Sequence, residues 1–238
     1  MTPPVRPDGR EVVYGRNPVR ELIAAGARPV HEVSVLAQLA DEPWLAGQRV
    51  VVRTRDQIGH RAGSSDHQGV LAVTDPYPYA EPQLLLERSG PIVCLDGAQD
   101  PRNLGAIARV AESVGAAGIV IPRRGSPGIT ATVAKASAGA VEHLAIARVG
   151  SMVSFVHDAS GASRVAIGAH PEGGIDYREV AWPRDVLLVM GAEGEGLRPR
   201  VREACDHLVR IPMAGSVASL NISVAAAILL FETLRTVK

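Results

Sequence analysis

Three stretches in the second half of the chain carry the glycines and polar side chains that could bind a ligand and act on it. They span residues 96–115, 186–197 and 209–227. In each of them an apolar, strand-like run leads into a loop, and a helix follows. Glycine-rich loops of this kind let the backbone approach a ligand closely, as nucleotide-binding turns do. The pattern predicts that these strand-to-loop junctions bind a small ligand.

The helix of the first stretch has an apolar face and a polar face. Its apolar residues recur at helical spacing: Ile107, Val110, Ala111 and Val114. Asn103 is placed to cap this helix, and Gly105, Arg109 and Glu112 lie opposite the apolar residues. Arg109 has two interpretations. It is a surface arginine paired with Glu112, which periodicity alone favours, or a functional residue above the groove that Gly105 leaves.

The second stretch has the glycine spacing G-x-x-G-x-G, starting at Gly191 after a late strand. A dinucleotide-binding loop instead has the spacing G-x-G-x-x-G and follows the first strand of its unit. Glu193 and Glu195 would also repel a pyrophosphate. A nicotinamide-dependent oxidoreductase is therefore disfavoured.

The third stretch ends in a helix that is apolar on nearly all sides. Ser219 and Asn221 are placed to cap it. Such a helix at this place is expected to be buried in a partner interface or crossed closely by another segment.

Taken in this order, the three stretches resemble the signature motifs of the SpoU/TrmH family of RNA ribose 2′-O-methyltransferases. The first contains N-x-G-x-x-x-R, the second G-x-E-x-x-G-L, and the third I-P-M followed by S-L-N-x-S-x-A. The likeness covers about Ile92 to the end of the chain. In addition, Tyr14–Val19 and His67–Val70 resemble the small RNA-binding domain of the rRNA-modifying members.

The resemblance implies transfer of a methyl group from S-adenosylmethionine to a ribose 2′-hydroxyl of structured RNA. Arg109 would then be catalytic, and the supporting polar residues would be Asn103, Glu193, Ser219 and Asn221. The cofactor would be held mainly by backbone groups, at or near Ala169, Gly191, Ile211, Met213 and Leu220. Lys135 stands where some relatives have a phosphate-binding arginine.

The resemblance also implies a fold and partners. The C-terminal part would form a deep trefoil knot, an exception to the rule against knots, and two subunits would pair around it as a homodimer. The RNA would be 23S rRNA, with tRNA as the alternative. A non-catalytic RNA-binding protein of the same fold is a further alternative, but loss of the motif arginine or asparagine would be its expected sign, and Arg109, Asn103 and Asn221 are all present.

The elements that must position these residues alternate between strand-like and helical patterns from residue 91 to 238. Alternation of this kind predicts an α/β domain whose mostly parallel sheet has helices on both faces. Residues 1–75 predict a small N-terminal α/β domain, which the resemblance identifies as the RNA-binding domain. Residues 76–90 predict a linker, because prolines crowd its beginning.

The charge pattern adds a weak indication of RNA binding. The net charge is zero, but Lys135 and Lys238 are the only lysines among 25 basic residues. Arginine suits phosphate binding, although a GC-rich genome gives the same bias. One arginine cluster in the N-terminal domain is a candidate for RNA backbone contacts: Arg49, Arg53, Arg55 and Arg61.

The sequence offers no pattern for a metal site or a membrane span. Cys94 and Cys205 stand apart from any Cys/His cluster, and they predict buried thiols in a reducing compartment. The longest apolar run, Val224–Phe231, is far shorter than the roughly 20 residues that a span requires. The first residues have no signal-peptide pattern, so a cytoplasmic protein is expected.

Overall fold

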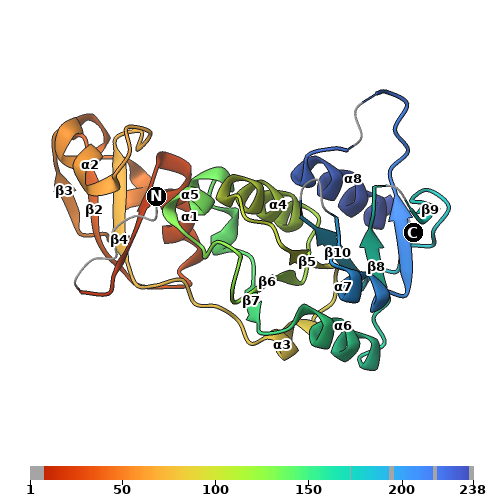
Figure 1. Cartoon of the computed structure of the whole chain (residues 1–238). Helices are drawn as coiled ribbons and strands as arrows, with labels where there is room; N and C mark the ends of the chain where they lie inside the picture. The colour runs from red at the N-terminus through yellow and green to blue at the C-terminus, as the bar shows by residue number, and fades with distance from the viewer. Residues whose placement is uncertain (1–7, 172, 193–195, 217–218, 236–238) are drawn as a thin grey trace. The chain divides into compact units, whose positions relative to one another are not determined.

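The computed structural model describes residues 8–171, 173–192, 196–216 and 219–235 (Figure 1). The chain divides into two compact units. The first unit comprises Met1–Pro78 and Gly128–His143, and the second comprises Tyr79–Pro127 and Leu144–Lys238. The first unit therefore includes a short segment from well beyond the proline-rich stretch.

The first unit is built on a four-stranded mixed sheet in the order β1-β4-β2-β3. Its strands are β1 (Glu11–Tyr14), β2 (Val30–Val35), β3 (Val50–Val52) and β4 (Val70–Thr74). β4 pairs antiparallel with both β1 and β2, and β2 pairs parallel with β3. The helices of this unit are α1 (Arg16–Ala25), α2 (Arg55–Ala62), α5 (Ala131–Ala136) and the short 3₁₀ turns η1 (Ala37–Leu39), η2 (Pro43–Leu45) and η3 (Ala140–Glu142).

Helix α2 is an element that the hydrophobic pattern does not reveal. It begins with a capping box, in which Thr54 Oγ1 accepts a hydrogen bond from Gln57 N at 3.3 Å and Gln57 Oε1 accepts one from Thr54 N at 3.0 Å. It ends at Gly63, whose φ of 62° is left-handed. The T-x-x-Q spacing is the local signal that predicts such a start.

The second unit is built on a seven-stranded sheet in the order β7-β6-β5-β10-β8-β11-β9, and its strand pairs are parallel. The strands are β5 (Ile92–Asp96), β6 (Gly118–Pro122), β7 (Ile146–Val149), β8 (Ala166–Ala169), β9 (Ile175–Asp176), β10 (Leu187–Gly191) and β11 (His207–Arg210). This confirms the predicted mostly parallel sheet beside a small N-terminal unit. The trefoil threading stays a prediction.

Helices cover both faces of this parallel sheet (Figure 1). On one face lie α4 (Pro101–Ser113) and α8 (Ile222–Arg235), which pack against each other. On the other lie α3 (Pro82–Leu86), α6 (Met152–Gly161) and α7 (Pro199–Glu203). Apolar side chains from α3, α6 and α7 meet those of the central strands in one buried cluster, as burial on both faces of a parallel sheet requires.

Residues 76–90 are not a linker throughout, because α3 lies among them. Leu85 of α3 is fully buried in the cluster of the second unit. The guanidinium of Arg164 donates to the carbonyl oxygens of Leu86 and Gly90 at 3.1 and 3.0 Å. Burial of one leucine and the hydrogen bonds of a buried arginine therefore attach the second half of this range to the second unit.

None of the helices in the described ranges combines the length and the apolar character that crossing a bilayer demands.

Candidate cofactor pocket and reaction centre

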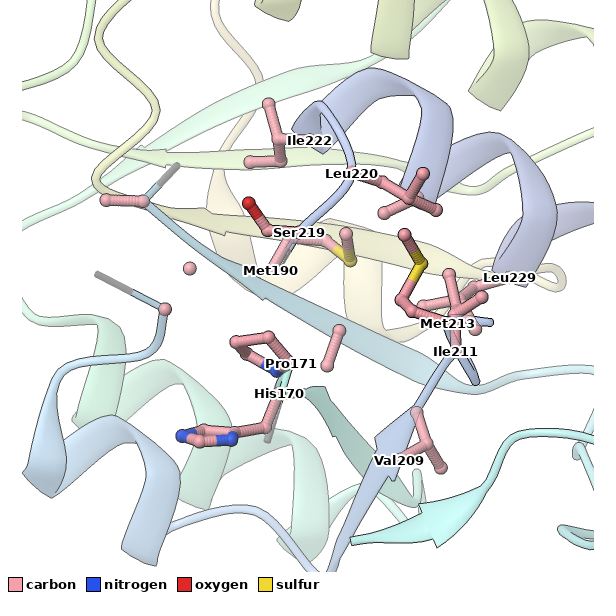
Figure 2. Close-up of a pocket in the computed structure, with 15 residues that line it drawn as sticks. His170, Pro171, Met190, Val209, Ile211, Met213, Ser219, Leu220, Ile222 and Leu229 are labelled. Atoms are coloured by element: carbon pink, nitrogen blue, oxygen red, sulfur yellow. The ribbon is translucent and has the colours of Figure 1, made fainter. Parts of the chain in front are cut away.

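A pocket lies at the carboxyl ends of strands β8, β10 and β11 (Figure 2). Its lining includes all five residues that the sequence analysis assigns to the cofactor: Ala169, Gly191, Ile211, Met213 and Leu220. These residues converge because parallel strands bring their carboxyl ends to the same edge of a sheet. Ser219 lines the same pocket, whereas Glu193 lies outside the described residues.

The remaining lining is mostly apolar and comes from both the sheet and α8. From the strands come Met190 and Val209, and from α8 come Ile222, Ala225 and Leu229. Ala225 is the last residue of the S-L-N-x-S-x-A motif, whereas the other four are indistinguishable from ordinary core residues in the sequence. His170 and Pro171 follow β8 directly, and His170 N donates to Val209 O at 2.9 Å. In the sequence, their position directly after a strand is the local feature that indicates a place in the pocket lining.

The backbone passes very close to itself at the end of β10. A Cβ built on Gly191 would lie 2.0 Å from the carbonyl carbon of Gly196. Ala192 and Gly196 exchange backbone hydrogen bonds of 3.0 and 2.9 Å. Gly191 is therefore required for a tight backbone turn at the pocket wall, which agrees with the close approach that the glycine spacing predicts.

Helix α4 begins one turn earlier than the sequence analysis places it, because Asp100 is its cap. Asp100 Oδ1 accepts a hydrogen bond from Arg102 N at 2.7 Å, and Pro101 occupies the first helical position. The prediction that Asn103 caps the helix is therefore wrong. Its side chain instead accepts a hydrogen bond, since Asn221 Nδ2 donates to Asn103 Oδ1 at 3.0 Å.

This amide pair joins the first stretch to the third across 118 residues of sequence. Asn221 Oδ1 in turn accepts from the backbone N–H of Ser223 at 2.9 Å and from its hydroxyl at 2.6 Å. These two bonds hold the Asn221 amide at the start of α8. A second hollow, lined by residues 97–100, Asn103, Ala192 and Ile222, shares Ala192 and Ile222 with the apolar pocket. Asn103 thus stands beside the apolar pocket.

The two faces of α4 differ from the prediction at one position. Arg109 is exposed, as expected, but Gly105 is buried together with Leu104 and Ala108. The apolar stripe is wider than the i, i+3, i+4 pattern suggests because α4 packs against both α8 and β6. Gly105 therefore allows close packing of α4 and does not form a surface groove beneath Arg109.

An ion pair that no sequence motif indicates lies beside the glycine turn. Asp96 ends β5 and is buried, and Arg198 Nε donates to both of its carboxylate oxygens at 3.0 Å. The hydrogen bond to Asp96 raises the pKa of Arg198, against a smaller opposing effect of burial. Arg198 directly precedes α7, so the pair connects the end of β5 to the segment that follows the glycines. In the sequence, the signal that indicates this ion pair is the aspartate at the end of a buried strand.

The arginine cluster of the first unit separates into two pairs. Arg53 Nη2 and Arg61 Nη1 both contact Glu32 Oε1, at 3.2 and 2.6 Å. Partial burial alone would raise the pKa of Glu32, but hydrogen bonds led by that from Arg61 lower it. Arg53 and Arg61 thus form ion pairs with Glu32 of β2 within the unit. Arg49 and Arg55 are exposed. Lys135 lies on α5 of the same unit.

No group of three or more His, Cys, Asp or Glu side chains within the described part of the chain is placed to hold a metal ion.

Comparison with known proteins identifies the chain. A family profile described as the SpoU rRNA methylase family matches residues 90–231, and one described as RNA 2′-O ribose methyltransferase substrate binding matches residues 12–80. The chain belongs to the SpoU methylase family. A protein of Staphylococcus haemolyticus assigned to the TrmH family of tRNA/rRNA methyltransferases is 34% identical over 94% of this chain and 95% of its own length. A Staphylococcus aureus protein of the same description is also 34% identical, with the same coverage.

Solved structures of this family share the fold over nearly the whole chain. The SpoU methyltransferase AviRb from Streptomyces viridochromogenes, in complex with S-adenosylmethionine, aligns with a TM-score of 0.81 and 26% identity, over 96% of this chain and 90% of its own. An rRNA methyltransferase from Sinorhizobium meliloti, also bound to S-adenosylmethionine, aligns with a TM-score of 0.79 and 26% identity, over 96% and 88%. This SpoU protein is therefore an RNA methyltransferase, and its methyl donor is S-adenosylmethionine.

The pocket fits that cofactor. Leu220, Ile211 and Leu229 offer apolar surface of the kind that covers an adenine ring. The strand ends at Ala169 and Gly191 present backbone N–H and C=O groups, and the wall at Gly191 has no room for a side chain. Such a site can bind the polar edges of a nucleoside without charged side chains.

Proposed function

We propose that this SpoU methyltransferase transfers a methyl group to a ribose 2′-hydroxyl of 23S rRNA. The observation that carries the proposal is the hydrogen bond between Asn103 and Asn221. It unites the first and third motifs at the hollow beside the cofactor pocket. The likeness of residues 12–80 to a substrate-binding domain of RNA 2′-O ribose methyltransferases supports the ribose as the target.

Bound S-adenosylmethionine supplies an electrophilic methyl group whose leaving group is a neutral thioether, so no acid is needed. The protein must align the 2′-oxygen, help it to lose its proton and hold the adjacent phosphate. Arg109 is exposed on α4 and available to RNA. A guanidinium is a donor-only group in proteins, so Arg109 does not act as a simple base. It orients the hydroxyl through the phosphate and stabilises the developing negative charge.

The other polar residues have supporting roles. Asn221 is held by Ser223, and it holds Asn103 in turn, so the Asn103 amide has a defined direction. Ser219 lines the cofactor pocket next to Leu220. Glu193 is a supporting polar residue of the reaction, as the resemblance of its motif implies. The cofactor is held at Ala169, Gly191, Ile211, Met213 and Leu220.

The first unit binds the RNA and distinguishes rRNA from tRNA. The rRNA methyltransferase from Sinorhizobium meliloti aligns over 96% of this chain, and so it shares both units. A TrmH/SpoU tRNA-modifying enzyme from A. aeolicus aligns over only 65%. A unit shared with an rRNA enzyme supports rRNA over tRNA as the substrate. The exposed Arg49 and Arg55 contact its phosphates, together with Lys135.

The functional protein is a cytoplasmic homodimer. On α8, Val224, Phe231 and Leu234 are about half exposed, at 48%, 54% and 45%. Burial of these side chains by a second copy would remove apolar area from water. Cys94 and Cys205 are both free thiols, consistent with a reducing compartment.

The test is methyl transfer from tritiated S-adenosylmethionine to transcribed 23S rRNA, with transcribed tRNA in parallel. A ribose 2′-O-methyl group blocks alkaline cleavage of the adjacent phosphodiester, so a label that survives in a dinucleotide identifies the modified atom. We expect labelled 23S rRNA with one protected linkage, and no label with the Arg109→Ala variant. Label on a base, or on tRNA alone, would contradict the proposal. Thermal stabilisation by S-adenosylhomocysteine but not by NAD excludes the oxidoreductase alternative.

A further inference from the structure

Residues 128–143 follow β6 in the sequence, yet they pack within the first unit. They contain α5 and η3, and the residues of α5 that face inward are buried: Ala131, Val133 and Ala134. α5 packs against β1 and α1, and η3 packs against α1. The family profile for the methylase covers this segment, whereas the profile for the substrate-binding domain ends at residue 80. The RNA-binding unit therefore includes a segment that the sequence assigns to the other domain.

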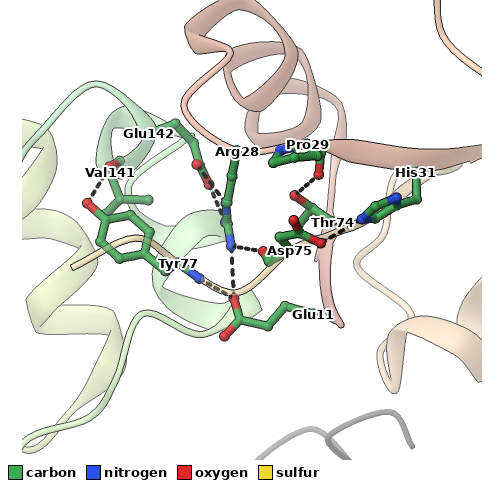
Figure 3. A network of polar contacts seen from close by, with 9 residues as sticks. All are labelled: Glu11, Arg28, Pro29, His31, Thr74, Asp75, Tyr77, Val141 and Glu142. Atoms are coloured by element: carbon green, nitrogen blue, oxygen red, sulfur yellow. Dashed lines mark hydrogen bonds and ion pairs between the residues drawn. The ribbon is translucent and has the colours of Figure 1, made fainter. Parts of the chain in front are cut away.

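A buried ion pair fastens this segment to the N-terminal part of the unit (Figure 3). Arg28 donates to Glu142 through two bonds, from Nε to Oε2 at 3.1 Å and from Nη2 to Oε1 at 2.7 Å. The side chains are 3% and 1% exposed. Arg28 Nη1 also donates to Glu11 Oε2 at 2.8 Å. Burial alone would lower the pKa of Arg28, but the bonds to Glu142 and then Glu11 raise it. Each nitrogen of the Arg28 guanidinium thus donates to a carboxylate oxygen.

Further contacts fix the same segment. The hydroxyl of Tyr77 donates to Val141 O at 3.1 Å, and the Arg28 guanidinium lies 5.5 Å from the centre of the Tyr77 ring. Gly139 has a φ of 94°, and a Cβ built on it would lie 2.6 Å from Glu21 Cβ on α1. The turn between α5 and η3 is therefore pressed against α1. These contacts attach the turn and η3, which directly follow α5, to the N-terminal part of the unit.

The side chain that this arrangement places is Lys135. A Cβ built on Gly15 would lie 2.9 Å from Lys135 Nζ and 3.3 Å from Gln68 Oε1. Gln68 Oε1 also accepts from Arg16 N at 3.1 Å, where α1 begins. Gly15 and Gln68, one from each N-terminal motif (Tyr14–Val19 and His67–Val70), thus lie at one place with the Lys135 ammonium group. Partial burial lowers the pKa of Lys135, and Asp66 opposes this effect.

Lys135 carries one of the two ammonium side chains in the sequence. Its ammonium group lies beside Gly15, whose φ of 102° and lack of a Cβ leave the space for it. An ammonium is a compact point charge with three donors, which suits it to a phosphate oxygen. A buried ion pair is a weak source of stability, because desolvation of two charges offsets their attraction. The Arg28–Glu142 pair is therefore better explained by its effect on structure, which is to hold residues 128–143 against the rest of the first unit.

We propose that Arg28 and Glu142 are positioning residues for RNA binding: they lock residues 128–143 onto the first unit so that Lys135 contacts a phosphate of the RNA. The inference rests on the proposed function, in that RNA is the molecule the first unit binds. It adds that the RNA surface is completed by a residue from the methylase segment. It also assigns Arg28 and Glu142 an effect on RNA affinity and none on cofactor affinity.

The test is a double-mutant cycle on the full-length protein, with transcribed 23S rRNA as the probe. The variants are Glu142→Gln, Lys135→Ala and the two combined, and filter binding across a salt series gives the RNA Kd. Loss of one charge-assisted bond should raise the Kd about tenfold in Lys135→Ala and reduce the slope of log Kd against log salt by about one. Glu142→Gln should do the same. The double variant should bind no more weakly than Lys135→Ala alone.

Controls separate positioning from general destabilisation. Arg28→Lys keeps the charge but loses the two-bond geometry, so it should share the RNA defect even where Glu142→Gln folds poorly. Glu203→Gln removes a carboxylate from the exposed face of α7 and should bind RNA normally. The Kd for S-adenosylmethionine should be unchanged in every variant. KM for RNA should rise in Glu142→Gln and Arg28→Lys and should keep the wild-type value in Glu203→Gln.

Two results overturn the inference. One is a wild-type RNA Kd in both Glu142→Gln and Arg28→Lys. The other is a double variant whose defect is the product of the single defects, because the pair would then act independently of Lys135. If the wild-type protein instead methylates no 23S rRNA, the proposed function itself fails, and the methyl-transfer assay with tritiated S-adenosylmethionine shows it before any variant is made.

Discussion

Replacing Gly191 with alanine puts a methyl group where the backbone leaves no room for one. A Cβ built on Gly191 lies 2.0 Å from the carbonyl carbon and 2.1 Å from the carbonyl oxygen of Gly196. Ordinary contacts begin at 3.4 Å, so the chain at Gly196 and Leu197 must move by about 1.4 Å. Because the colliding atoms belong to the backbone, no side-chain rotation relieves the overlap. The pocket wall is therefore displaced.

The expected loss of cofactor affinity follows from the cost of that overlap. Overpacking of this kind costs about 1–3 kcal/mol. In the free protein the segment at Gly196 can move away, but cofactor binding requires the original wall, which both Gly191 and Gly196 line. The cost then falls mainly on binding, and the Kd for S-adenosylmethionine should rise about 5-fold to 150-fold. The melting temperature should fall by only a few degrees.

Isothermal titration calorimetry with S-adenosylmethionine measures this Kd, and scanning calorimetry of the same preparation measures the melting temperature. Gly150→Ala is the matched control, because Gly150 is exposed and an added Cβ would meet nothing within 4 Å. The control should bind like the wild type. If Gly191→Ala also binds with an unchanged Kd and melts at the wild-type temperature, the close backbone approach at the pocket wall is refuted.

Further predictions concern other parts of the molecule. Arg109→Ala should lower kcat by about 10²–10³ with an unchanged Kd for S-adenosylmethionine. Arg109→Lys should also lose activity if the guanidinium donates two hydrogen bonds to the RNA phosphate. Methyl-transfer kinetics measures the two variants, and wild-type turnover in Arg109→Ala would favour a surface role. Asp96→Asn should weaken the bond to Arg198 and cost about 1–3 kcal/mol of unfolding free energy in urea titrations, an unchanged midpoint being the contrary result. Phe231→Glu should convert the dimer to monomers in light scattering, and a monomeric wild-type protein would refute the dimer. Deletion of residues 1–78 removes Arg28, the partner of buried Glu142, so the truncated protein should have a much lower melting temperature than the full-length protein. Equal melting temperatures would show that residues 128–143 do not depend on residues 1–78.

The sequence by itself was sufficient for the fold class. The signals there are local: an apolar run marks a buried strand, and a glycine or small residue after it marks a close backbone turn. The family resemblance assigned Ala169, Gly191 and Ile211 to the cofactor, and the structure brings them to one pocket because parallel strands share the edge at which they end. Their contact with the cofactor stays a prediction. The motif spacing also sufficed for the family, which the comparisons confirm.

Only the tertiary structure decided which partners the polar and small residues have. Asn103 has the sequence pattern of a helix cap, yet it bonds to Asn221, while Gly105 is buried where α4 packs. Arg53 and Arg61 belong to an RNA-binding cluster by spacing, but Glu32 on β2 engages both. The Arg28–Glu142 pair spans 114 residues of sequence. Periodicity records which face of an element is apolar, but a polar bond depends on which two elements the fold brings within about 3 Å of each other, and no local pattern contains that distance.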